Sequence, residues 1–199
     1  PSLKDISFQA MPGETIGIIG GTGSGKSTLV SLIPRFYDPQ DGQVYMDGEN
    51  VTEYTRKSIG EKVGIVQQRS VLFQGSIRDN LKWGDENATD EDIWKAIEIA
   101  QAKEVVEGKP GKLDFQLEQN GRNLSGGQKQ RLTIARALVK KPEILILDDS
   151  ASALDFATDA ALRKAIHGLE GKMTTFLVSQ RVAGIKQADK ILVLGNGEL

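Results

Sequence analysis

The feature that most constrains this chain is a glycine-rich stretch near its N-terminus, set between an apolar run and a short helical segment. The apolar run, residues 15–19, predicts a buried strand, and residues 28–33 predict a helix that ends before Pro34. The stretch fits the phosphate-binding pattern G-x-x-x-x-G-K-[ST] and comprises Gly20, Gly21, Thr22, Gly23, Ser24, Gly25, Lys26 and Ser27.

The residue types in this P-loop suit a phosphate chain with Mg²⁺. Glycines let several backbone N–H groups converge on one anion, and the following helix N-terminus adds partial positive charge. Lys26 would place a cation on the outer phosphates, and the Ser27 hydroxyl would ligate Mg²⁺. The competing interpretation is a glycine-rich turn with one exposed lysine, and the strand and helix on either side argue against it.

Composition limits the possible classes of protein. A length of 199 residues suits one domain, or one domain with an inserted subdomain. With 39% hydrophobic and 26% charged residues, a packed core is expected rather than disorder. The net charge of −2 gives no argument for nucleic-acid binding, and the lack of cysteine excludes disulfide and thiolate chemistry.

Neither a signal peptide nor an apolar run of the roughly 20 residues that cross a bilayer is visible in the sequence. We therefore expect a domain that faces the cytosol. Both ends look cut, because a strand-like stretch is already under way at residues 3–9 and the Asn196-Gly197 turn comes just before the last residue. We expect a fragment of a longer protein.

Alternating strands and helices predict an α/β fold with a mainly parallel sheet and a short antiparallel element near residues 43–46. Residues 1–66 and 141–199 are expected to form the core, and residues 67–140 an inserted helical subdomain. Besides 15–19, the expected strands cover residues 3–9, 62–66, 144–147, 174–178 and 190–194, and the expected helices begin near residues 90, 124 and 157.

A second element of a nucleotide site follows the apolar run of residues 144–147. Asp148 and Asp149 come directly after this buried strand, where an acid can reach Mg²⁺ through an oxygen ligand. Two acids that merely cap a strand end are the alternative, and the P-loop elsewhere in the chain disfavours it.

A third motif, Leu124-Ser125-Gly126-Gly127-Gln128, forms a second phosphate-binding turn at a helix start. One domain does not need two such turns for one phosphate chain, but two domains facing head-to-tail do. With these motifs the chain resembles the nucleotide-binding domain of an ATP-binding cassette (ABC) transporter, over nearly all of its length.

The resemblance implies a P-loop NTPase core of RecA type that binds ATP and Mg²⁺, paired with a second such domain and with transmembrane coupling helices at the cytoplasmic face of a membrane. It implies an ATPase that powers transport, and the stretch Phe73–Asn80 resembles the exporter form. It assigns ATP contacts to residues 20–27 and Thr28, metal contacts to Ser27, Asp148 and Gln68, and contacts to the partner's ATP to Ser125, Gly126, Gly127, Gln128 and Asp155. The family's adenine-stacking aromatic would precede Leu3, so we expect it to lie outside this sequence.

Two residues depart from the family pattern. Asp149 stands where a glutamate usually acts as general base beside the water-contacting Gln68, and Gln180 stands where a histidine usually contacts the γ-phosphate. Aspartate is one methylene shorter than glutamate, and glutamine cannot carry a proton charge. The only histidine, His167, lies outside any motif. We therefore expect a site that binds ATP but hydrolyses it poorly, as in one half of a heterodimeric exporter.

Two other functions are weighed. A regulatory module that binds nucleotide without hydrolysis would explain Asp149 and Gln180, but it would not need the intact motif at Ser125. A P-loop protein of another class, such as a kinase, GTPase or DNA-repair ATPase, is also disfavoured. The chain has no N-K-x-D pattern to select guanine, and the interval between the P-loop and residue 124 is too short for the large insertion of a coiled-coil repair ATPase.

Overall fold

The computed structural model describes residues 3–169 and 171–199, which fall into two compact units. The first unit comprises the described residues up to Ile65, together with Pro142–Asp149 and Gly171–Leu199. The second comprises Val66–Lys141 and the described residues from Ser150 to Leu169.

The first unit is built on a five-stranded sheet in the order β4-β7-β8-β1-β9. Strands β7, β8, β1 and β9 pair in parallel, with Ile18 of β1 opposite both Val178 of β8 and Leu192 of β9. Because parallel strands end at one edge, the loops after β1, β7 and β8 meet there. The strands are β1 Thr15–Gly20, β4 Val63–Val66, β7 Ile144–Asp148, β8 Thr174–Val178 and β9 Lys190–Leu194.

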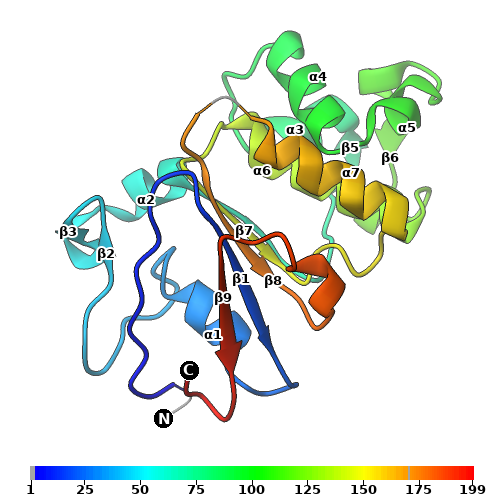
Figure 1. Cartoon of the computed structure of the whole chain (residues 1–199). Helices are drawn as coiled ribbons and strands as arrows, with labels where there is room; N and C mark the ends of the chain where they lie inside the picture. The colour runs from blue at the N-terminus through cyan, green and yellow to red at the C-terminus, as the bar shows by residue number, and fades with distance from the viewer. Residues whose placement is uncertain (1–2, 170) are drawn as a thin grey trace. The chain divides into compact units, whose positions relative to one another are not determined.

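Apolar side chains from the strands and from the helices beside them form the core of this unit. Helix α1 (Lys26–Ser31) lies against β1, β7 and β8 (Figure 1). Its Leu29 and Val30 are buried in the same cluster as Ile16 and Ile146. A hairpin of β2 (Tyr45–Met46) and β3 (Glu49–Asn50) leads through the short η1 (Val51–Glu53) into α2 (Arg56–Lys62). The short η4 (Val182–Gly184) precedes β9.

The second unit is mostly helical, and α6 (Gly126–Val139) packs against α3 (Ile77–Lys82) and α4 (Asp90–Ile99) (Figure 1). Three of its helices begin with a capping box, in which the N-cap hydroxyl and the N3 side chain satisfy each other's backbone N–H groups. Their N-caps are Ser76, Thr89 and Ser125. The remaining elements are β5 (Gly75–Ser76), α5 (Lys103–Glu107), η2 (Lys112–Asp114), β6 (Gln116–Leu117), η3 (Gln119–Gly121) and α7 (Phe156–His167).

The α/β fold with its mainly parallel sheet and short antiparallel strands is the one expected from the sequence. One predicted strand, residues 3–9, is wrong. Asp5 adopts a left-handed φ of 51° that breaks the extended run, and Leu3 and Ile6 pack on the core without joining the sheet. The segment from Ser150 to Leu169 also differs from expectation, because it groups with the helical unit through contacts of α7 with α4.

Candidate functional site

The P-loop of the first unit wraps around the side chain of Lys26. Its ammonium donates hydrogen bonds to the carbonyl oxygens of Gly20 at 2.7 Å and Gly21 at 2.8 Å. Only 8% of Lys26 is exposed, which excludes a solvated lysine on a bare turn. Gly25, with a left-handed φ of 102°, is the N-cap of helix α1 and has no side chain that could accept a hydrogen bond. The N–H groups of the first helical turn have no acceptor within the helix, so they are available to a ligand. The loop thus presents backbone donors and one cation, the chemistry that binds phosphate.

Gly20 is fixed by a close approach at the end of β1. A β-carbon at this position would lie 2.4 Å from the carbonyl oxygen of Leu194 and 2.5 Å from Oγ of Ser24. No side chain fits in that space, so the start of the loop requires glycine.

Ser27 and Asp148 provide two oxygens that suit a divalent cation. The Ser27 hydroxyl donates a hydrogen bond to Oδ1 of Asp148 at 3.1 Å, which brings the start of α1 to the end of β7. Hydroxyl and carboxylate oxygens are the ligand types that Mg²⁺ prefers. Among the described residues no group of three or more His, Cys, Asp and Glu could hold a metal.

Asp149 follows directly and is held by the neighbouring strand. Its backbone N–H donates to the carbonyl of Val178 at 2.9 Å, and its φ of 48° is left-handed. Burial and the adjacent Asp148 raise the pKa of the Asp149 carboxyl, while Arg181 and Lys26 act in the opposite direction. A raised pKa makes this carboxylate a better proton acceptor.

Gln180 lies in the loop after β8, at the same edge of the sheet, and is exposed. The loop is anchored on both sides of it, because Ser179 donates its N–H to Ile18 at 3.0 Å and its Oγ accepts from the N–H of Arg181 at 2.9 Å. Sequence analysis predicts no role for Arg181, whose charge lowers the pKa of Asp149. The one sequence feature that could have pointed to Arg181 is its position directly after Gln180.

In the second unit, the turn at Ser125 is exposed to solvent. Oγ of Ser125 accepts from the N–H of Gln128 at 3.2 Å, and Oε1 of Gln128 accepts from the N–H of Ser125 at 3.0 Å. Ser125 and Gly126 are exposed, and a β-carbon on Gly127 would lie 3.1 Å from the carbonyl of Ala153. The motif therefore packs beside the loop that leads to Asp155.

Asp155 has a structural role in its own unit. It caps α7 by accepting from the N–H of Thr158 at 2.9 Å and from its hydroxyl at 2.7 Å, and these bonds lower the pKa of Asp155. Gln68, two residues after β4, belongs to the same unit and is exposed. The structure thus gathers residues 20–28, Asp148, Asp149 and Gln180 in one unit, and residues 125–128 with Asp155 in the other.

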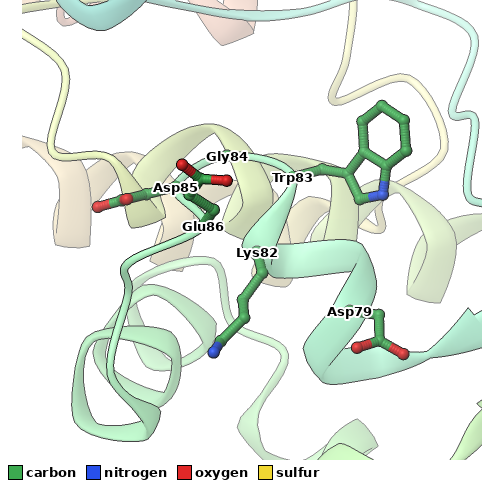
Figure 2. A pocket seen from close by; sticks show the side chains of 6 residues that line it. All are labelled: Asp79, Lys82, Trp83, Gly84, Asp85 and Glu86. Atoms are coloured by element: carbon green, nitrogen blue, oxygen red, sulfur yellow. The ribbon is translucent and has the colours of Figure 1, made fainter.

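The second unit also has a hollow of about 550 Å³, and none of the residues that line it is a candidate site residue. Figure 2 shows that the side chains of Lys82 and Trp83 point in different directions, so its polar groups do not converge on one ligand. The lining residues are Asp79, Lys82, Trp83, Gly84, Asp85 and Glu86.

Comparison with known proteins finds the family described as "ABC transporter" matching residues 3–152. The chain is 47% identical to the uncharacterized ABC transporter ATP-binding protein YfiB of Bacillus subtilis, over 100% of this chain and 34% of that protein. It is 45% identical to the beta-(1-->2)glucan export ATP-binding/permease protein NdvA of Rhodopseudomonas palustris, over 100% of this chain and 33% of that protein.

Among solved structures, a bacterial Atm1-family ABC exporter with ATP bound superposes with a TM-score of 0.94 at 36% identity, covering 100% of this chain and 35% of that one. The chain therefore spans about a third of the length of the curated relatives it matches. None of its described helices has the length and apolar character needed to cross a membrane.

Proposed function

Since the chain belongs to the ABC transporter family, we propose that it is the ATP-binding domain of a membrane exporter and works at the cytoplasmic face of the membrane. The observation that carries this proposal is the buried Lys26 beside the Ser27–Asp148 hydrogen bond. It places a cation and two metal-ligating oxygens at the start of one helix, as a bound Mg·ATP requires.

Each residue at this edge then has a distinct part in binding. The backbone of Gly20–Ser27 and Thr28 holds the phosphates, and Lys26 neutralises the outer ones. Ser27 and Asp148 would hold Mg²⁺, and the family resemblance assigns a further contact to Gln68, which belongs to the second unit. When bound, the cation supplies charge stabilisation for the transferred phosphoryl group.

Our proposal further holds that this chain's own site hydrolyses ATP poorly. The candidate base Asp149 is one methylene shorter than glutamate, and an error of about one ångström in the position of such a group can cost on the order of a hundredfold in rate. Gln180 donates a hydrogen bond without carrying charge. Both departures affect proton transfer and leave the phosphate-binding loop intact.

The exposed turn at Ser125 gives the chain a part in a second site. In a head-to-tail pair of nucleotide-binding domains, Ser125, Gly126, Gly127 and Gln128 would contact ATP held by the partner's P-loop, with Asp155 nearby. The exposure of Ser125 and Gly126 supports this assignment, because a partner's nucleotide can reach them. ATP would close the pair, and hydrolysis mainly at the composite site would reopen it and drive export. We expect the partner to be a different chain, since a homodimer would contain two weak sites.

The alternative is a regulatory nucleotide-binding module of a membrane complex that does not take part in hydrolysis. Asp149 and Gln180 favour it, and the intact Ser125 motif favours the motor. Single-turnover cleavage of ATP, measured for the chain with copies of itself and then with its partner half, separates the two. We expect slow cleavage alone and fast cleavage with the partner. Fast cleavage by the self-paired chain would overturn the impaired site, and none in either assembly would favour the regulatory module.

A further inference from the structure

A turn more than 170 residues away in the sequence holds the backbone of the P-loop. The last strand, β9, ends in a two-residue turn at Asn196-Gly197, closed by mutual hydrogen bonds between Gly195 and Glu198 of 2.9 and 3.0 Å. The N–H of Gly197 donates to the carbonyl oxygen of Ser24 at 3.0 Å. We propose that Gly197 is a positioning residue, which fixes the Ser24–Gly25 peptide in the orientation that binds phosphate. The inference takes its ligand, ATP, from the proposed function.

The planar trans peptide explains how one distant hydrogen bond can set a binding group. The carbonyl of one residue and the N–H of the next point in opposite directions. With the Ser24 carbonyl directed at the turn, the N–H of Gly25 points away from the turn. A flip of this peptide would reverse the direction of the Gly25 N–H, so that it points towards the turn. Gly25, with φ 102°, offers little steric resistance to a flip, so the hydrogen bond from Gly197 supplies a restraint that this glycine does not.

The same turn supports the P-loop at a second point. Leu194 precedes the turn and lies opposite Gly20 in the β1–β9 register, and its carbonyl oxygen occupies the space of a Gly20 side chain. The loop is therefore braced by β9 at its first residue and by the turn at its fifth. Neither contact involves a side chain that binds nucleotide.

The turn also links the P-loop to the N-terminal segment. The N–H of Lys4 donates to the carbonyl of Gly197 at 2.8 Å, so a backbone path runs from Lys4 through Gly197 to Ser24. A displacement of the turn would reach both segments. Gly197 therefore connects the start of the described chain with the phosphate-binding loop.

A second turn in the same unit has the same backbone conformation and serves as a control for backbone strain, with Gly48 exposed where Gly197 is buried. Asp47 and Gly48 join β2 to β3 with φ values of 52° and 81°, against 51° and 82° for Asn196 and Gly197. Alanine in place of either glycine meets the same backbone strain, because both positions need a left-handed φ. Only the turn at Gly197 bonds to the P-loop.

The experiment compares Gly197→Ala with Gly48→Ala by titration with Mg·ATP and by the backbone amide spectrum of the nucleotide-free protein. We expect the strain of alanine at this left-handed position to displace the turn and weaken the bond from its N–H to Ser24. The Kd for ATP should then rise by about tenfold, the scale of one hydrogen bond, and the Gly25 amide signal should shift. We expect Gly48→Ala to leave the Kd within about twofold, as for a surface change, with an unmoved Gly25 signal. Equal effects of the two variants, or an unmoved Gly25 signal in Gly197→Ala, would overturn the inference.

Two further outcomes are covered. If Gly197→Ala does not fold, hydrogen exchange of the unaltered protein decides, and saturating Mg·ATP should slow the Gly197 amide but not the Gly48 amide. Unchanged exchange at Gly197 would refute the positioning role. If the unaltered protein does not bind ATP, the proposed function is wrong, while the Gly25 signal of the nucleotide-free variants still tests the link between turn and loop.

Discussion

The hydroxyl of Ser27 donates a hydrogen bond to Oδ1 of Asp148 at 3.1 Å, joining two residues that lie 121 positions apart. The link exists because β1 and β7 are parallel strands of one sheet, so that the loop after β1 and the end of β7 meet at one edge. The P-loop supplies phosphate donors there, and the strand end supplies a carboxylate. The two halves of the candidate Mg·ATP site thus come from a single topological feature.

The first prediction concerns Lys26. Removing its ammonium by Lys26→Ala deletes the cation that we expect to face the outer phosphates, a charge-assisted interaction that contributes about 1.5–3 kcal/mol. We expect the Kd for ATP to rise by about 10- to 100-fold in isothermal titration calorimetry. Lys57→Ala, which changes an exposed lysine of the same unit, is the control and should leave the Kd unaltered. An unchanged Kd in Lys26→Ala would contradict the assignment of the site.

The second prediction concerns the length of the candidate base. Restoring the missing methylene with Asp149→Glu should raise ATP cleavage at this chain's own P-loop by up to about a hundredfold, because the carboxylate would then reach the attacking water. Asp149→Asn keeps the shorter side chain and lacks the proton acceptor, so it should give no gain. Gln180→His alone should change turnover little. Rapid-quench measurement of single turnovers in the assembled transporter checks all three, and equal rates for Asp149→Glu and Asp149→Asn would refute the impaired-base interpretation.

The third prediction concerns acid stability of the helical unit. Hydrogen bonds from Lys141 at 2.8 Å and from Thr89 lower the pKa of Asp92 from 3.8 to about 2. Because the folded protein favours the charged carboxylate, the stability it contributes is present above pH 3.8 and is lost as the pH falls towards 2. We expect the Tm to fall across this range, and Asp92→Asn to flatten part of the fall. Glu91→Gln, an exposed neighbour, is the control, and an unaltered slope in Asp92→Asn would contradict the coupling.

Much of the fold could be predicted from local sequence, because its strands are uninterrupted apolar runs. The strands expected at residues 174–178 and 190–194 are β8 and β9, and the helix expected to begin near residue 90 is α4, which begins at Asp90. The strand predicted at residues 3–9 failed because alternation of apolar residues indicates a half-buried segment but not a hydrogen-bonding partner. The grouping of α7 with α4 depends on tertiary contacts that no local pattern encodes.

Some features of the candidate site could be predicted from the sequence and others could not. Its grouping of the P-loop with Asp148 could be predicted, since parallel strands end together. Two hydrogen bonds could not be predicted, the one from Asp149 to Val178 and the one from Gly197 to Ser24. Both join backbone groups of distant segments and leave no side-chain pattern in the sequence. The catalytic roles of Gln68, Asp149 and Gln180 stay predictions, as do the contacts of Ser125 and Asp155 with a partner's nucleotide.

The fourth prediction separates the two roles of Ser125, as helix cap and as contact to a partner's ATP. Ser125 and Thr89 both begin helices of the second unit with a capping box, so Ser125→Ala and Thr89→Ala each lose an N-cap worth about 1 kcal/mol. Both variants should therefore lose similar stability, measured by denaturant unfolding. Only Ser125→Ala should abolish ATPase of the assembled pair, while its own P-loop keeps its Kd for ATP.

The same two variants also test whether Ser125 acts only as a helix cap. If Ser125 acted only as a cap, the two variants would reduce steady-state turnover equally, in proportion to their shared loss of stability. If Ser125 contacts the partner's nucleotide, turnover falls in Ser125→Ala and is kept in Thr89→Ala, whose cap lies at the start of α4. Unchanged turnover in Ser125→Ala would contradict the contact of Ser125 with the partner's ATP and would count against the composite site.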